Sequence, residues 1–150
     1  MLSRTFLWPQ GYTSAAMISV NLDAEFYGRI FYPGIDVSEG DIQRLGWTGM
    51  EYGLPHLLDC FREHGVKGTF FIPGRVAELY PDAVRAIADA GHELGCHGYE
   101  HEILAHFTPE EQLELLKKAK AAIEKAAGRA VTGFRMPEGE ITEQTLVAAK

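Results

Sequence analysis

The 150-residue sequence predicts an α/β fold with a parallel sheet. Short apolar segments alternate with longer segments whose apolar residues recur at helical spacing, an order typical of strand–helix–strand units with right-handed crossovers. Polar residues directly follow three of the apolar segments, namely Asp23, His97 and Arg135. Since parallel α/β folds carry their active sites at the carboxyl ends of the strands, we expect these side chains to converge at one edge of the sheet.

Four apolar segments are expected to form the strands, and turn or polar residues bound each of them. They span residues 15–22, 69–72, 93–96 and 131–134. Helices are expected between and after them, over residues 51–64, 81–90, 109–127 and 141–150. The third helix has the strongest start signal, with Thr108 as N-cap, Pro109 at the first position and Glu111 placed for a capping box.

The connection from residue 24 to about residue 49 is expected to be a long loop. It is rich in glycine and in the aromatic residues Tyr27, Phe31, Tyr32 and Trp47. Loops of this length in compact domains are usually functional or disordered, and the aromatic content favours an ordered binding lid. Trp47 and its neighbours are therefore candidates to line a substrate groove, and the alternative is a small satellite core beneath the loop.

Composition limits the classes of partner. The net charge is −7 without long charged runs, which argues against nucleic acid and against an anionic membrane surface as partners. The sequence shows no signal peptide and no apolar run near the ~20 residues that span a bilayer. The two cysteines form no disulfide framework, and we expect reduced thiols in a cytoplasmic protein.

Two histidines four residues apart are the strongest candidate site. His97 and His101 would point the same way if the backbone between them made one helical turn. Two imidazoles and one carboxylate are a common ligand set for a catalytic zinc with an open position, and Asp23 is the candidate carboxylate.

These motifs, in this order, resemble the polysaccharide deacetylase family of metal-dependent amide hydrolases. The resemblance runs from about residue 17 to 137 and is carried by Asp23, by the segment His97-Gly98-Tyr99-Glu100-His101, and by Arg135-Met136-Pro137. The segments 53–58, 68–74 and 90–101 resemble most the branch that includes peptidoglycan deacetylase-like, allantoinase-like and cyclic imide hydrolase proteins.

The resemblance implies a distorted, incomplete (β/α) barrel, with residues 1–150 as one catalytic domain cut to roughly its N-terminal two-thirds. It implies a divalent metal, zinc before cobalt, nickel or iron, held by Asp23, His97 and His101, whose bound water attacks an amide or imide carbonyl. Arg135 is expected to hold the catalytic acid in place. The oxyanion is expected to meet a backbone N–H near Tyr99 or in the segment 135–138.

Two departures from the family pattern keep the function open. Asn21 occupies the position of the presumed base, and an amide has no useful basicity near neutral pH. Glu25 is a nearby carboxylate and the alternative candidate for the base. The family's late Leu-x-His motif, whose histidine acts as general acid, is missing before Lys150.

Three hypotheses follow: a hydrolase of non-peptide C–N bonds acting on an N-acetylated sugar, cyclic imide or ureide; a metal- or sugar-binding pseudoenzyme; and an inactive truncated remnant. Open strand edges and apolar faces of an incomplete barrel would be hidden by homo-oligomerisation.

Overall fold

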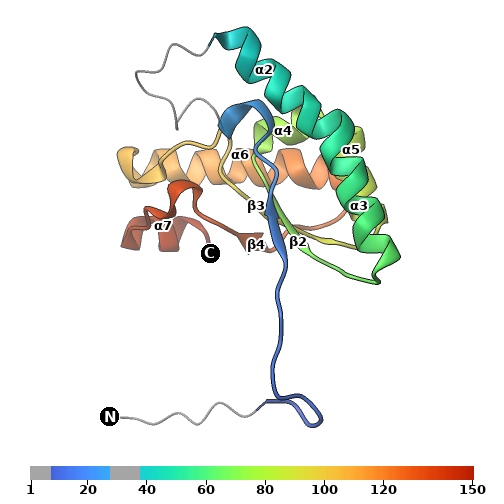
Figure 1. Ribbon diagram of the computed structural model, residues 1–150. Helices are drawn as coiled ribbons and strands as arrows, with labels where there is room; N and C mark the ends of the chain where they lie inside the picture. Colours follow the sequence, from blue (N-terminus) through green and yellow to red (C-terminus); the bar gives the residue numbers. More distant parts are fainter. Residues whose placement is uncertain (1–7, 28–37) are drawn as a thin grey trace.

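The computed structural model describes residues 8–27 and 38–150 (Figure 1). Four parallel strands form one sheet in the order β1-β2-β3-β4, which is also their order in the chain. They are β1 (Ser19–Asn21), β2 (Thr69–Ile72), β3 (Glu93–Cys96) and β4 (Gly133–Phe134). The predicted α/β class and parallel sheet are confirmed, and over the described residues the sheet is open rather than a closed barrel.

The register of the sheet brings the strand ends together. Asn21 pairs with Phe71, Phe71 with Gly95, and Gly95 with Gly133. The residues that follow β1, β3 and β4 therefore emerge at one edge, as the parallel pattern predicts. This register places Asp23, His97 and Arg135 near one another.

Helices pack on the sheet and complete the core. They are α2 (Glu39–Thr48), α3 (Leu54–Glu63), α4 (Gly74–Leu79), α5 (Pro81–Asp89), α6 (Pro109–Ala127) and α7 (Glu143–Ala148). Phe70 and Ile72 of β2 are fully buried, and Phe70 contacts Phe61 of α3 and His92. Within the described part of the chain, no helix is both long enough and apolar enough to cross a membrane.

The best-signalled elements form where they were predicted. Strands β2 and β3 occupy the predicted ranges, while β1 and β4 are shorter than their apolar segments. Helix α6 begins with the predicted capping box between Thr108 and Glu111, and ends at Gly128, which adopts a left-handed φ of 69°. Helix α7 is capped by Thr142.

The expected long loop over residues 24–49 is wrong for its described part. It contains a 3₁₀ turn, η1 (Ala24–Phe26), and helix α2, capped by Ser38. Glycine lowers helix propensity, so the sequence of this segment indicates a loop. Gly46 is nevertheless needed in the helix, because the backbone of η1 packs directly against it. A Cβ there would lie 2.4 Å from the backbone nitrogen of Glu25. Phe31 and Tyr32, two of the predicted lid aromatics, lie outside the described residues.

Helix α4 was not predicted, because Pro73-Gly74 signals the end of a strand and not the start of a helix. Gly74 is needed for a close helix–helix contact, since a Cβ there would lie 2.5 Å from the Cα of Ala119 in α6 and 2.8 Å from the Tyr99 ring. The tertiary contact overrides the local signal.

Replacing Gly74 with alanine should therefore destabilise the fold by about 1–3 kcal/mol, since α4 must move away from α6. Gly53→Ala is the matched control: Gly53 has a helical φ of −64° and nothing within 4 Å of its added Cβ. That change should stabilise by about 0.5–1 kcal/mol. Urea unfolding of both variants measures the difference, and equal stabilities would contradict the close-packing argument.

Candidate metal centre

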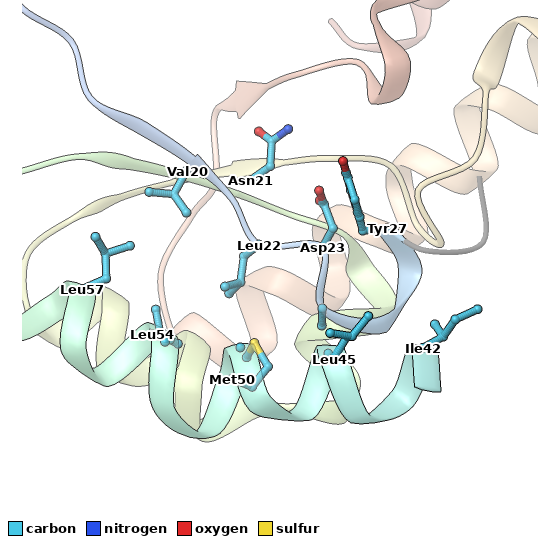
Figure 2. A pocket seen from close by; sticks show the side chains of 14 residues that line it. Val20, Asn21, Leu22, Asp23, Tyr27, Ile42, Leu45, Met50, Leu54 and Leu57 are labelled. Carbon is cyan, nitrogen blue, oxygen red and sulfur yellow. The ribbon is translucent and has the colours of Figure 1, made fainter. Parts of the chain in front are cut away.

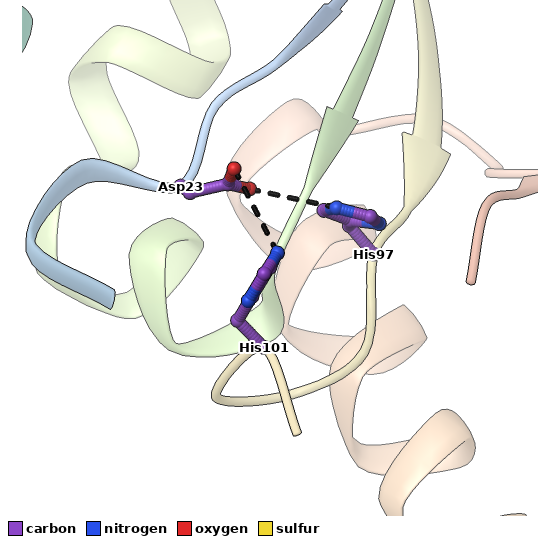
Figure 3. A group of neighbouring side chains, drawn as sticks. All are labelled: Asp23, His97 and His101. Atoms are coloured by element: carbon purple, nitrogen blue, oxygen red, sulfur yellow. Dashed lines mark ion pairs between the residues drawn. The ribbon is translucent and has the colours of Figure 1, made fainter. Parts of the chain in front are cut away.

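Asp23, His97 and His101 meet at the carboxyl edge of the sheet (Figure 3). Asp23 lies just beyond β1, His97 directly follows β3, and His101 lies in the next loop. One ligand atom from each lies within 4.8 Å of the others. The Nε2 atoms of His97 and His101 are 3.6 Å and 3.8 Å from the two carboxylate oxygens of Asp23. The sequence prediction that these three residues converge agrees with the geometry.

The backbone between the histidines is a loop and not the expected helical turn. Gly98 and His101 both adopt left-handed conformations, with φ of 73° and 62°. The Glu102 carboxylate accepts hydrogen bonds from the N–H groups of Tyr99 (2.8 Å) and Glu100 (2.5 Å), which closes the loop on itself. The i, i+4 spacing therefore brings the imidazoles together through a turn organised by Glu102, a residue that sequence reasoning missed.

The three side chains are almost completely buried, with exposures of 7% for Asp23, 1% for His97 and 2% for His101. Among the described residues, Asp23 Oδ1, His97 Nε2 and His101 Nδ1 are buried and have no hydrogen-bond partner. Buried polar atoms are nearly always hydrogen-bonded, and leaving one unsatisfied costs about 1–3 kcal/mol. Oxygen and imidazole nitrogen are zinc donors, so this group fits a divalent metal.

The protonation of His97 suits a ligand. Its Nδ1 lies 2.8 Å from the backbone carbonyl of Arg135, so Nδ1 carries the proton and Nε2 presents its lone pair toward Asp23. Burial lowers the pKa of His97 to about 4, so the ring is neutral at pH 7. Burial also raises the pKa of Asp23, and the neighbouring Glu138 carboxylate adds to that rise while His101 opposes it.

Arg135 connects Asn21 with the cluster of Asp23, His97 and His101, which we call the metal group because it could hold a metal ion. Its guanidinium donates to Asn21 Oδ1 (2.8 Å) and to Ser19 Oγ (2.8 Å), and lies 4.0 Å above the Phe71 ring. Asn21 is thus held where the resemblance expects the catalytic acid to be held. Glu25, the alternative base, accepts a hydrogen bond from the Tyr80 hydroxyl (3.2 Å) and does not line the cavity over the metal group.

That cavity has a volume of about 370 Å³. Its lining consists of Asn21, Asp23, Tyr27, His97, His101, Arg135, Met136, Glu138 and Gly139. All three described non-glycine residues with positive φ border the site: Ala24 follows Asp23, His101 belongs to the group, and Glu138 lies beside it. Backbone strain of this kind is concentrated at functional sites.

Two predicted substrate residues do not line this cavity. Trp47 is on α2, half exposed, with its ring edge-to-face against Tyr52 at 5.7 Å. The Tyr99 ring is buried, with its hydroxyl donating to Glu78, and its N–H is already bonded to Glu102. Neither is placed to bind substrate or an oxyanion there, because local packing and hydrogen bonds engage both.

A larger apolar cavity of about 630 Å³ lies between β1 and the helices α2 and α3 (Figure 2). Val20, Leu22, Met50, Leu54 and Leu57 supply apolar lining. Asn21 and Asp23 belong to the lining of both cavities, so β1 separates a polar site from an apolar groove.

Comparison with known proteins assigns the family. The family model for polysaccharide deacetylases matches residues 47–150, and the chain therefore belongs to the polysaccharide deacetylase family. The peptidoglycan deacetylase of Helicobacter pylori is 37% identical over 114 residues, covering 76% of this chain and 38% of that protein. The peptidoglycan-N-acetylglucosamine deacetylase of Bacillus cereus is 39% identical, covering 61% and 34%.

Solved structures agree with this assignment. A protein of Mycobacterium smegmatis assigned as a polysaccharide deacetylase superposes with a TM-score of 0.82 at 31% identity, covering 96% of this chain and 50% of that one. A carbohydrate esterase family 4 pseudoenzyme of Bacillus anthracis gives 0.64 at 33% identity, covering 67% and 36%. The chain thus spans about half, or less, of these relatives.

Asp23→Asn should make the metal-free protein more stable at pH 7.5, by about 1 kcal/mol, because it removes a buried, unpartnered charge. Since the folded-state pKa of Asp23 is raised, the wild type regains that stability as the pH falls through this pKa, and the difference should shrink. Urea unfolding between pH 4 and 8 with a chelator present measures it.

The same variant should lose any stabilisation that excess zinc gives the wild type. Asp59→Asn, in an exposed ion pair with Arg62, is the control and should change neither quantity. A less stable Asp23→Asn protein in the metal-free state would show that the carboxylate is a structural group.

Proposed function

We propose that the chain holds a divalent metal, zinc by preference, at Asp23, His97 and His101, and carries the site of a hydrolase that removes acetyl groups from an N-acetylated glycan. The observation that carries the proposal is the cluster of three buried residues whose possible ligand atoms lie within 4.8 Å of one another at a cavity on the sheet edge. Among the described residues, Asp23 Oδ1 and His97 Nε2 in this cluster have no hydrogen-bond partner. The family assignment and the relatives named peptidoglycan deacetylases support the substrate class.

A divalent metal in such a site supplies a Lewis acid that polarises the amide carbonyl and activates water. The protein's own groups position the reactants. The Arg135 carbonyl accepts a hydrogen bond from His97 and fixes its ring. The Arg135 guanidinium donates to Asn21 Oδ1, which leaves the NH₂ group of Asn21 to orient a water molecule.

The segment 135–138 retains few backbone donors for the oxyanion. The Arg135 N–H is used by the Cys96 carbonyl, and Pro137 has none. The N–H groups of Met136 and Glu138 are therefore the donors that we assign to this role in place of Tyr99.

A metal-binding pseudoenzyme is the second candidate, and Asn21 is the observation that favours it. The amide cannot accept the proton that a carboxylate would take. The similarity to a family 4 pseudoenzyme from Bacillus anthracis, of which a mutant with restored enzymatic activity has also been solved, supports this alternative. The cytoplasmic location and homo-oligomerisation stay predictions from the sequence.

Purified protein loaded with zinc should retain about one ion per chain, because three ligands suffice for a catalytic-type site. His97→Ala should lose the ion, and His106→Ala, an exposed histidine in η3 (Leu104–His106), should keep it. Elemental analysis after desalting gives the stoichiometry. Absence of metal in the wild type after loading would overturn the proposal and the pseudoenzyme alternative together.

Asn21→Asp should raise deacetylation of N-acetylated chitooligosaccharides by about 10²–10⁴-fold, the usual contribution of a positioned base. Arg135 already donates to this side chain, so the introduced carboxylate would be held in place. Asn21→Ser is the control, because it removes the amide without adding a base. Acetate release reports deacetylation, and loss of the ultraviolet absorbance of a cyclic imide reports its ring opening, so the two assays separate the substrate classes. An Asn21→Asp enzyme no faster than the control would sink the base assignment.

A further inference from the structure

Glu138 lies on the far side of His101 from Asp23. Its Oε1 is 3.8 Å from His101 Nδ1, while Asp23 Oδ2 is 3.8 Å from Nε2 of the same ring. His101 is therefore placed between two carboxylates, one at each ring nitrogen. In the described part of the chain no other carboxylate lies within 4 Å of His101 Nδ1.

The two histidines differ in how their Nδ1 atoms are satisfied. His97 Nδ1 donates to the Arg135 carbonyl at 2.8 Å, whereas His101 Nδ1 is buried and no described residue is its hydrogen-bond partner. A histidine that ligates a metal through one nitrogen nearly always donates the other N–H to a carboxylate or carbonyl, which fixes the tautomer and the ring orientation. For His101 that partner is missing unless Glu138 supplies it.

The backbone at Glu138 has an uncommon conformation that accompanies the placement of its side chain beside His101. Glu138 adopts a left-handed φ of 57° and is followed by Gly139 at 76°, in the turn η4 (Pro137–Gly139) that comes directly after Arg135-Met136. A non-glycine residue in this region is uncommon and costs free energy. Its side chain nevertheless is only 21% exposed and lines the cavity with Asp23 and His101.

We propose that Glu138 is a positioning residue that accepts a hydrogen bond from the Nδ1–H group of His101 when the metal is bound, so that Nε2 of His101 faces the metal beside Asp23. The inference rests on the metal site proposed above. Each histidine then has an acceptor at its Nδ1 atom. The Arg135 carbonyl is the acceptor for His97, and the Glu138 carboxylate, three residues later, is the acceptor for His101. One short segment thus orients both imidazole ligands.

The test is zinc affinity, measured by competition with a chromophoric chelator. Glu138→Ala should weaken zinc binding by about 10- to 100-fold, the usual effect of losing such a partner. Glu138→Gln should retain much of the affinity, because its amide oxygen still accepts a hydrogen bond from Nδ1. Glu140→Ala, an exposed carboxylate two residues further on, is the matched control and should bind as the wild type does.

A second readout follows the proton itself. Long-range ¹H–¹⁵N spectra of the zinc-loaded wild type should show both imidazoles protonated at Nδ1. In Glu138→Ala the His101 Nδ1 signal should shift or be lost to exchange, while the His97 signal, held by the Arg135 carbonyl, stays and serves as an internal reference.

The outcomes separate this inference from the proposed function. Zinc binding by the wild type, with Glu138→Ala and Glu140→Ala indistinguishable in affinity and in the His101 signal, overturns the role of Glu138 and leaves the metal site standing. A wild type that binds no zinc overturns both.

Discussion

The candidate site depends on the burial of the Asp23 carboxylate against two imidazoles. Among the described residues, each of the three side chains has a buried polar atom without a hydrogen-bond partner, and the parallel register brings the strand ends that carry Asp23 and His97 together. Burying such groups together is unfavourable unless a cation compensates for the charge and the missing hydrogen bonds. The buried cluster therefore lowers the stability of the metal-free fold at this edge of the sheet, and metal binding would offset that loss.

Arg135 connects the parts of the site that lie far apart in the sequence. Its N–H pairs with the Cys96 carbonyl in the sheet, its carbonyl accepts from His97, and its guanidinium reaches Asn21 and Ser19 on β1. The Phe71 ring supports the guanidinium from below. A change in this residue would therefore disturb a ligand and the base position together, so that loss of activity in an Arg135 variant could not be assigned to one role.

Much of the fold could be predicted from the sequence, because its signals are local. Strands β2 and β3 follow from apolar runs between turn residues, and α6 follows from its capping box. Helices α2 and α4 could not be predicted, because Gly46 and Gly74 weaken the local signal and serve contacts with residues distant in the sequence. In the site, the convergence of Asp23, His97 and His101 was predicted. The loop between the histidines was not, because it depends on Glu102.

Asn21 and Glu138 both contribute to the net charge of the polar cavity. With Asn21 neutral, Asp23 and Glu138 are the two carboxylates that line the polar cavity, and the Arg135 guanidinium opposes them. A divalent cation at the three ligands would leave this group with one net positive charge, whereas a carboxylate at position 21 would bring it to neutrality. The charges that line the cavity are therefore compatible with a carboxylate at position 21, to which Arg135 could donate as it donates to Asn21. On the proposed function, Asn21 removes the proton acceptor while Asp23, His97, His101, Arg135 and the cavity remain in place, so we expect metal binding and turnover to be separable in this chain.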